Sequence, residues 1–509
     1  MGGHCLSFPD YREVVAETDS LRQAREGLIT TLAAAADSLP GDEWILGQRV
    51  RYLVEGARPE EAVAVAERCQ VPRRWWCSAL AGYAWHVMGD LERADSAFAA
   101  ALRAMPEANR RRWMDISIFL DGRLRGRYLE SSPQQRDSLE RRFWWLADPL
   151  HMTPGNERRT EHFARNVLVH LLDNAESGYP DVRRSRLREI ILRHGWPTGW
   201  VRVVQPGDPR TTSVYAPPRR RFVPYPHFIL DPTGIGSSEW HAWDTYQYPP
   251  RATTAPLETY RPRHLSSISR IEHQVATFQR GDSVVVVAAY DQSPDWSWLY
   301  NDRVDVALIL ARDELSTPIV RRETRRGARG VLIAKVEAIP WLLSLEVRSR
   351  VLRRAARARY GLGLRKRDPL LLAVSDLLLL SPGDSLPASL WRAIPSARGS
   401  LRVRPGERLG LYWETYAPSR ETQRLFVSVA TYKVAEGSLD RLEEVELEEN
   451  PPIDLSWQEV VPPDTYIWVR AITLDLPRDL SQGLYVIYLT VLSFGREPVQ
   501  AVRGLYVER

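Results

Sequence analysis

The stretch ALAGYAWHVMGDLERADSAFAAALRAMP, residues 79–106, decides how the front half of this chain folds. Small, aromatic, turn and stop residues stand in it at regular intervals, and these are Gly82, Trp85, Gly89, Ala94, Phe98, Ala101 and Pro106. Small side chains at Gly82 and Ala94 allow two helices to approach closely, while the ring of Phe98 fills the groove between them. Because proline cannot continue a helix, Pro106 ends the second one. The stretch therefore predicts a helical hairpin.

The spacing of these residues resembles the tetratricopeptide repeat, a family of stacked helical hairpins. The preceding stretch, with Gly56, Ala62 and Ala66, looks like a degenerate earlier copy. We therefore expect residues 1–130 to form a tetratricopeptide-like helical region. Such repeats bind a protein or peptide in a concave groove. The contact surface expected for this partner consists of Trp85, Trp76 and Trp113.

A second helical block is predicted over residues 131–205. Ser132 precedes a proline, a pair that typically opens a helix. Two further helices are expected over residues 157–174 and 182–194. Gly195 stands directly after the last of them, at the position where glycine commonly ends a helix.

The spacing of apolar residues changes after this block. Residues 206–268 are rich in Pro, Tyr and Arg without clear periodicity, which indicates an extended connector that packs through its aromatic side chains. Residues 269–385 and 386–509 contain short, regularly spaced runs of β-branched and Leu residues, which are typical of antiparallel β-sandwich domains. The runs expected to be strands are residues 283–290, 304–311, 330–337, 341–347, 370–379, 408–416, 425–432, 465–472, 483–492 and 501–507. The predicted fold class is therefore multidomain α+β, with helices in front and two β-sandwiches behind.

The composition indicates an ordered protein of several domains. A length of 509 residues exceeds what one hydrophobic core supports, so roughly three or four domains are expected. All but three of the 69 basic residues are arginines, which we attribute to a GC-rich genome. A net charge of +5 is small for this length, so no nucleic-acid partner is expected. No apolar run is long enough to predict a transmembrane span.

Arginines crowd residues 348–367. If this stretch were a helix, it could present a basic face to nucleic acid or to an anionic membrane. Because it lies between strands of the first predicted sandwich, we interpret it instead as a hairpin whose exposed arginines protect an edge strand.

Two cysteines serve as an indicator of compartment. Cys69 and Cys77 lie eight residues apart, at the end of one predicted helix and early in the next, and a turn at Pro72 could bring them within disulfide distance. In an exported protein, a disulfide between them and two free thiols are both alternatives. In a reducing cytosol, free thiols are expected. We expect the cell envelope or exterior if an upstream signal peptide is missing from this chain, and the cytoplasm otherwise.

Motifs of common active sites are absent from the sequence. It contains no nucleophile elbow, P-loop or dinucleotide fingerprint. Its His and Cys residues do not have zinc-site spacing. We therefore expect no cofactor and no metal ion. Because catalytic triads are assembled in space rather than in sequence, an enzyme stays open as an alternative.

Three short segments carry a second resemblance, and they are FWWLADP at residues 143–149, TPGNE at residues 153–157 and GWPT at residues 195–198. Together they resemble the bacterial GWxTD-domain family. The family motif ends in Asp, and this chain has Gly199 there, which puts any function of that Asp in doubt. The segment RPGER at residues 404–408 is similar to part of the β-sandwich that accompanies the domain. The resemblance covers residues 137–509.

This resemblance implies a protein that is often exported and has no established activity. The motif residues, which we interpret as structural, are Trp144, Trp145, Asp148, Pro149, Asn156, Gly195, Trp196 and Thr198. We predict a non-enzymatic interaction or scaffold protein of the bacterial cell envelope or exterior, which binds a protein or peptide partner through its repeat groove and sandwich surfaces. The alternative is a hydrolase that acts on a polymer at the junction of helices and sandwich, around His151, Trp196 and Trp200.

Overall fold

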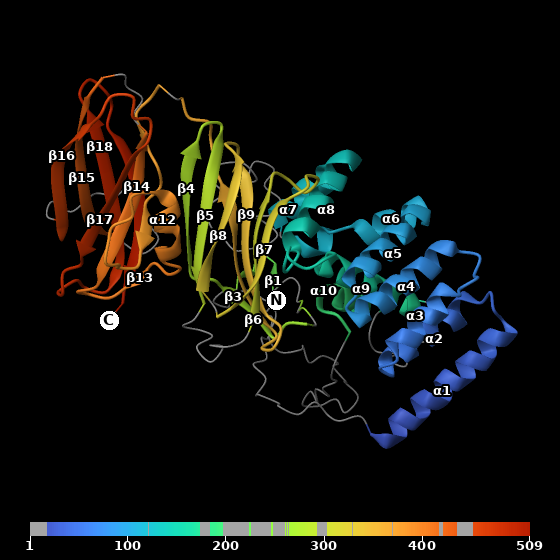
Figure 1. Cartoon of the computed structure of the whole chain (residues 1–509). Helices are drawn as coiled ribbons and strands as arrows, with labels where there is room; N and C mark the ends of the chain where they lie inside the picture. Colours follow the sequence, from blue (N-terminus) through green and yellow to red (C-terminus); the bar gives the residue numbers. More distant parts are fainter. Residues whose placement is uncertain are drawn as a thin grey trace, which may run out of the picture. The chain divides into compact units, whose positions relative to one another are not determined.

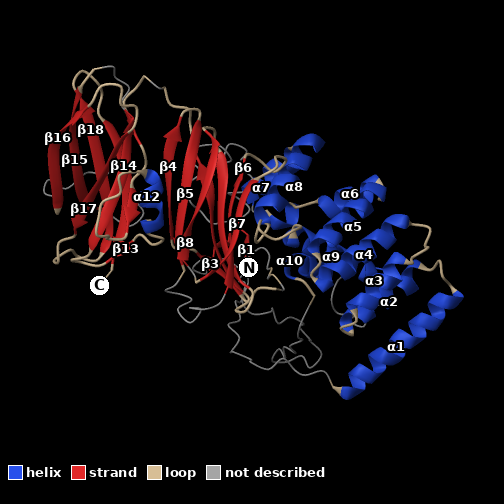
Figure 2. Ribbon diagram, in the orientation of Figure 1, coloured by secondary structure: helices blue, strands red, loops and turns tan. Residues whose placement is uncertain are grey.

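The computed structural model combines helices and sheets in one chain (Figures 1 and 2). The described residues are 18–120, 122–173, 184–196, 223–224, 246–247, 260, 262, 264–292, 303–327, 329–368, 370–416, 421–434 and 451–508. An N-terminal helical region precedes a region of several mainly antiparallel sheets, so the chain is α+β, as the sequence predicts. The predicted connector over residues 206–268 lies almost entirely outside the described residues.

The chain divides into two compact units. Unit 1 consists of Met1–Pro149, Thr153–Pro224 and Pro249–Arg263. Unit 2 consists of Leu150–Met152, Tyr225–Tyr248 and His264–Arg509. The sequence predicts a division of the chain into five parts, and this division stays a prediction.

Unit 1 contains the helices of the front half. They are α1 (Asp19–Ser38), α2 (Glu43–Glu55), α3 (Pro59–Glu67), α4 (Arg74–Met88), α5 (Leu91–Ala104), α6 (Glu107–Met114), the 3-10 turn η1 (Ser117–Phe119), α7 (Gly122–Glu130), α8 (Pro133–Ala147), α9 (Glu157–Asp173) and α10 (Arg184–His194). Helix α8 begins as predicted, because the Ser132 hydroxyl accepts from the backbone N–H of Gln135 while the Gln135 side chain accepts from the N–H of Ser132. Helix α10 ends at Gly195, whose φ of +84° is left-handed.

Helices α4 and α5 form the hairpin that residues 79–106 predict. Gly82 faces the ring of Phe98, and a Cβ atom added at Gly82 would lie 2.8 Å from Cδ1 of that ring. Phe98 is fully buried, as are Ala94 and Ala101. The small residue therefore permits the close approach that places the aromatic ring between the helices.

Unit 2 contains the sheets of the rear half. Its strands are β3 (Ser267–Arg270), β4 (His273–Arg280), β5 (Ser283–Asp291), β6 (Arg303–Ala311), β7 (Ile319–Arg326), β8 (Arg329–Glu337), β9 (Trp341–Ser349), β10 (Arg354–Leu362), β11 (Ala373–Val374), β12 (Leu378–Leu380), β13 (Arg402–Val403), β14 (Arg408–Tyr416), β15 (Gln423–Val434), β16 (Ile453–Val461), β17 (Trp468–Asp475), β18 (Gly483–Ser493) and β19 (Val499–Val507). Most of the predicted strands are confirmed, but the single strand expected over residues 370–379 is two short ones, β11 and β12.

Among its described residues, this unit has four sheets of three or more strands. Sheet A has the order β3-β10-β9-β6-β7, sheet B β4-β5-β8, sheet C β11-β14-β12 with β17 beside β14, and sheet D β13-β19-β18-β15-β16. Apolar side chains fill a core between sheets A and B, a second between B and C, and a third between C and D. The short helix α12 (Leu390–Ala393) contributes to the second core.

The middle core explains the apolar run of β5. Val284 and Val286 belong to the core shared with sheet A, whereas Val285 and Val287 belong to the core shared with sheet C. Because both faces of this strand are covered, its sequence lacks the polar alternation of a half-exposed antiparallel strand. The two predicted β domains are therefore continuous through a shared core.

Polar contacts join sheets B and C as well. Arg280 of β4 forms a two-pronged ion pair with Glu414 of β14, with nitrogen–oxygen distances of 2.6 and 2.8 Å. Glu414 is 1% exposed, so this pair is shielded from water. The side-chain amide of Gln274 donates to the carbonyl oxygen of Leu379, and the backbone N–H of Leu379 donates back to it. These contacts take the place of a strand partner along the free edge of β4.

The interpretation of residues 348–367 as an edge hairpin is wrong in one respect. Strands β9 and β10 do form an antiparallel hairpin, but they lie in the middle of sheet A. Arg357 and Arg359 of β10 are buried, and the guanidinium of Arg359 lies 3.2 Å from the carboxylate of Glu346. A buried arginine is tolerated where a buried carboxylate compensates its charge. The arginine-rich edge strand of this sheet is β7.

Candidate functional site

Helix α9 occupies the face of the helical hairpins where the sequence predicts a partner. It packs against α2, α4 and α5. The indole of Trp76 is 1% exposed and lies 4.5 Å, between ring centroids, from His170 of α9. Trp113 is 5% exposed and stacks on Phe163 of the same helix. Two of the three predicted contact residues are therefore core residues. Trp85 stays half-buried beneath the guanidinium of Arg93.

The contact between α4 and α9 includes a buried polar triad. One ring nitrogen of His86 lies 3.0 Å from the hydroxyl of Thr160, and the other lies 2.7 Å from the carboxylate of Glu161. This order of hydroxyl, imidazole and carboxylate is the order of a hydrolytic triad. However, Thr160 is fully buried and also donates to the carbonyl oxygen of Glu157. A substrate cannot reach its oxygen, so the triad fixes α9 in place.

The TPGNE segment forms the start of α9. The side-chain oxygen of Asn156 accepts from the backbone N–H of Arg159, which caps the helix. Its amide nitrogen donates to the carbonyl oxygen of Trp144 at a distance of 2.6 Å. Gly155 has a φ of +77°, and a Cβ atom there would lie 2.6 Å from the backbone of Leu91. The segment is thus shaped by helix capping and by close backbone packing.

The FWWLADP segment ends α8 and supplies an aromatic core. Trp144 is 1% exposed, its ring lies 4.7 Å from His162, and the guanidinium of Arg158 lies over it. Burial, followed by the positive charge of Arg158, lowers the pKa of His162 to about 3. The imidazole is therefore neutral, and its Nε2–H donates to the carbonyl oxygen of Trp113. Asp148 and Pro149 are buried and Trp145 is half-buried.

The GWPT segment is anchored by an arginine of α9. The guanidinium of Arg165 donates to the carbonyl oxygens of Leu192 and Arg193, both at 3.0 Å, which satisfies the last turn of α10. A Cβ atom at Gly195 would lie 3.5 Å from this guanidinium. Trp196 is half-buried, with the guanidinium of Arg51 4.7 Å from its ring centroid. Thr198 and Trp200 lie outside the described residues.

Cys69 and Cys77 are joined by a disulfide in unit 1. Their Cα atoms are 5.5 Å apart, within the range of protein disulfides. The bond links the segment that follows α3 to the first turns of α4, and Cys69 belongs to the core of the helical unit. It therefore fixes the angle at which the chain turns between these helices.

The residues named for the alternative hydrolase do not form a site within either unit. His151 belongs to unit 2 and Trp196 to unit 1, while Trp200 lies outside the described residues. In unit 2 the backbone N–H groups of His151 and Met152 donate to the two oxygens of Glu346, at 3.0 and 2.8 Å. Glu346 is fully buried and also accepts from Ser344. The carboxylate of Glu346 thus holds the backbone of His151 and Met152 in place.

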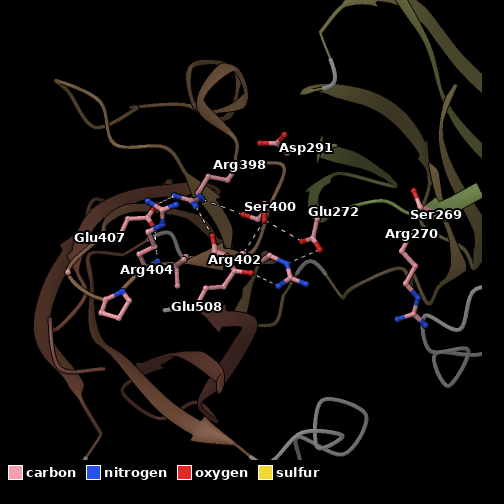
Figure 3. A pocket seen from close by; sticks show the side chains of 13 residues that line it. Ser269, Arg270, Glu272, Asp291, Arg398, Ser400, Arg402, Arg404, Glu407 and Glu508 are labelled. Carbon is pink, nitrogen blue, oxygen red and sulfur yellow. Dashed lines mark hydrogen bonds and ion pairs between the residues drawn. The ribbon is translucent and has the colours of Figure 1, made fainter. Parts of the chain in front are cut away.

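A polar cleft in unit 2 is the candidate binding site, with a volume of about 940 Å³ (Figure 3). It is built from the ends of β3 and β5, the segment around β13 and the residue after β19. The lining residues are Ser269, Arg270, Glu272, Asp291, Arg398, Ser400, Arg402, Val403, Arg404, Pro405, Gly406, Glu407 and Glu508. Because these residues span more than 200 positions of the chain, only the fold brings them together.

Two arginines of the cleft are held by carboxylates. Arg402 pairs with Glu508 and, at 3.0 Å, with Glu272, and these hydrogen bonds raise the pKa of its guanidinium above the ordinary value. Arg398 pairs with Glu407 and donates to the carbonyl oxygen of Arg402 at 2.9 Å. Figure 3 shows these side chains gathered around Ser400. The pairs fix the wall of the cleft in one conformation.

Two other arginines of the cleft have no such partner. Within the described part of the chain, the guanidinium groups of Arg270 and Arg404 form no ion pair or hydrogen bond, and both residues are exposed. Figure 3 shows Arg270 apart from the paired group around Arg402. Exposed guanidinium groups beside a fixed polar wall can donate two parallel hydrogen bonds to carboxylate or phosphate oxygens.

Comparisons with known proteins give the chain no family. No protein-family model matches it, and no curated protein does. The solved structure of a red sea bream transglutaminase is similar over 47% of this chain and 32% of that one, with 8% sequence identity and a TM-score of 0.16. The matched part thus spans about a third of the transglutaminase, and a likeness at this TM-score carries no argument about fold or activity.

Two features are absent from the residues that the structure describes. Among them, no group of three or more His, Cys, Asp and Glu side chains is arranged to hold a metal ion. None of the helices placed in the structure combines the length and apolar character that crossing a bilayer requires.

Proposed function

We propose that this chain is a non-enzymatic interaction protein of the bacterial cell envelope or exterior, and that it holds an acidic segment of a partner protein in the cleft of unit 2. One observation carries the proposal: Arg270 and Arg404 are unpaired at a cleft whose other arginines are already fixed by Glu272, Glu407 and Glu508. A pre-organised wall loses little conformational entropy on binding, so the free guanidinium groups can contribute to affinity.

In this proposal the helices are a tetratricopeptide-like region whose groove holds the chain's own α9. The supporting contacts are the Gly82–Phe98 packing and the burial of Trp76 and Trp113 against α9. The sheets are proposed to be two β-sandwiches that share a third core. Because their cores are continuous, they act as one rigid support for the cleft. In this proposal the partner therefore contacts the surface of unit 2 and not the repeat groove.

Membership of the GWxTD-domain family is part of the same proposal. Asn156, Gly155 and Gly195 cap or terminate helices, and Trp144 packs in an aromatic core. Motif residues with these roles are expected to preserve a structure rather than a reaction. The Cys69–Cys77 disulfide favours an oxidising compartment, which is consistent with export.

The test is partner capture by the full chain from an extract of the source cells. The baits are the wild type, the variant Arg270→Gln/Arg404→Gln, and a control, Arg392→Gln/Arg424→Gln, that removes two exposed arginines of unit 2 outside the cleft lining. Each charged hydrogen bond contributes about 1.5–3 kcal/mol. We therefore expect the wild type and the control to enrich the same partner, and the cleft variant to lose it. Equal capture by all three baits would refute the assignment of the cleft.

A further inference from the structure

A row of arginines crosses the end of sheet A in unit 2. Strands β6, β7 and β9 are neighbours in this sheet (Figure 1). Arg303 of β6 pairs directly with Arg326 of β7. Arg350 follows Ser349, the β9 partner of Val304, and therefore lies on the other side of Arg303. Neighbouring strands are about 4.8 Å apart, so like charges directly opposite each other repel.

Among the described residues, the carboxylate beside this row is that of Asp305, and it pairs with one arginine of the row, Arg350. One oxygen of Asp305 accepts from Arg348 and Arg350, each at 2.8 Å, and the other accepts from Thr324 at 3.0 Å. These hydrogen bonds outweigh the opposing effect of partial burial and lower the pKa of Asp305. The carboxylate is thus ionised and fully engaged.

The other two arginines of the row have no compensating carboxylate among the residues that the structure describes. Arg303 and Arg326 are exposed and form no ion pair with any residue that the structure describes. Arg350 is 75% exposed although it contacts Asp305. Arg322, also exposed, lies four residues before Arg326 and so on the same face of β7. The described residues of sheet A therefore present a cationic surface at this end.

An apolar side chain stands at the tip of the same surface. Val351 lies in the turn between β9 and β10, directly after Arg350, and is 70% exposed. An exposed apolar residue among arginines is typical of proteins that bind the interface of an anionic bilayer, where phosphates hold the cations and the apolar group enters the headgroup region. Single-stranded nucleic acid instead needs aromatic platforms for its bases, and the described residues of this row are arginines and a valine.

We propose that this arginine row, Arg303, Arg326 and Arg350 with Val351 at its tip, binds the surface of a membrane rich in anionic phospholipids. The site is separate from the cleft of unit 2, and the inference does not rest on the proposed function. Each arginine beside an anionic surface strengthens binding by roughly fivefold. Loss of all three should therefore weaken membrane binding on the order of 100-fold.

The experiment measures co-sedimentation of the full chain with vesicles. The two vesicle types are phosphatidylcholine alone and phosphatidylcholine mixed with phosphatidylglycerol. The variants are Arg303→Gln/Arg326→Gln/Arg350→Gln, Val351→Asp, and a control of equal charge change, Arg392→Gln/Arg424→Gln/Arg478→Gln, whose exposed arginines lie outside the row. Circular dichroism of each variant shows that it is folded before its binding is compared.

We expect the wild type and the control to sediment with anionic vesicles only, with binding that weakens as salt rises. The triple variant should lose this binding, and Val351→Asp should reduce it. The proposal is overturned if the wild type ignores anionic vesicles, or if the triple variant binds them as the control does. It is also overturned if the wild type prefers a single-stranded oligonucleotide, measured by fluorescence anisotropy, because the partner is then a nucleic acid.

Discussion

Replacing Gly155 by alanine should destabilise unit 1 far more than the same replacement at Gly89. Both glycines have left-handed backbones, with φ of +77° and +84°, and a side chain in that region costs about 1–2 kcal/mol. At Gly89 an added Cβ atom meets nothing within 4 Å. At Gly155 it would lie 2.6 Å from the carbonyl carbon and oxygen of Leu91 and 2.9 Å from the nitrogen of Glu92. These are backbone atoms at the start of α5, and they cannot move aside as a side chain could.

The added clash sets the magnitude. Overpacking costs about 1–3 kcal/mol where side chains can shift. We therefore expect Gly155→Ala to lower the free energy of unfolding by about 2–5 kcal/mol, against about 1–2 kcal/mol for Gly89→Ala. Urea unfolding followed by far-UV circular dichroism measures both values in the same helical unit. Equal losses at the two positions would show that backbone conformation alone explains Gly155, and that its packing against α5 is misjudged.

Three further outcomes are expected. Burial raises the pKa of Glu140 to about 7. In the folded state this carboxyl therefore keeps a proton that the unfolded chain releases near the ordinary pKa of glutamate. The free energy of unfolding falls as pH rises between these two pKa values. Glu140→Gln should thus raise the free energy of unfolding by up to about 3 kcal/mol above pH ~7, and by little at about pH 4. Urea unfolding at both pH values checks this. A difference between variant and wild type that does not change with pH would contradict it. Glu346→Ala leaves Arg359 without its carboxylate inside sheet A and should cost about 3–5 kcal/mol, seen as a lower midpoint for unfolding of the sheets. Replacing Cys69 and Cys77 by alanine should cost about 2–3 kcal/mol by the loop-entropy argument, measured as a lower melting temperature; an unchanged melting temperature would mean that the bond is not formed.

The front half of the fold was predictable where packing leaves a local mark. Glycine and alanine at fixed distances from Phe98 indicate a tight hairpin, and α4 and α5 form it. Helix ends at Ser132 and Gly195 follow from local capping chemistry. The packing of α9 against α2, α4 and α5 was not predictable, because it depends on contacts such as His86–Thr160 between residues 74 positions apart.

The rear half was predictable for apolar strands and not for polar ones. Strand β5 is a continuous apolar run because both of its faces are covered. Strand β7, with the sequence IVRRETRR, was missed because an edge strand with exposed side chains carries no apolar signal. The cleft was missed for another reason: Arg270 lies in sheet A and Glu508 directly follows β19 of sheet D, and only the fold of unit 2 makes them line one cleft. Unpaired arginines become visible as a site only when their neighbours are known.

The arginine bias of this chain has a structural use beyond its genomic origin. The single guanidinium of Arg165 contacts two carbonyl oxygens of α10 and, through Nε, the carboxylate of Glu161. Arg503 likewise donates to the carbonyl oxygens of Leu377 and Val275 and so ties sheets B, C and D together. Lysine carries one compact ammonium and cannot reach such divergent acceptors with a planar fork. A chain supplied almost only with arginine can therefore cross-link its own backbone in the interior.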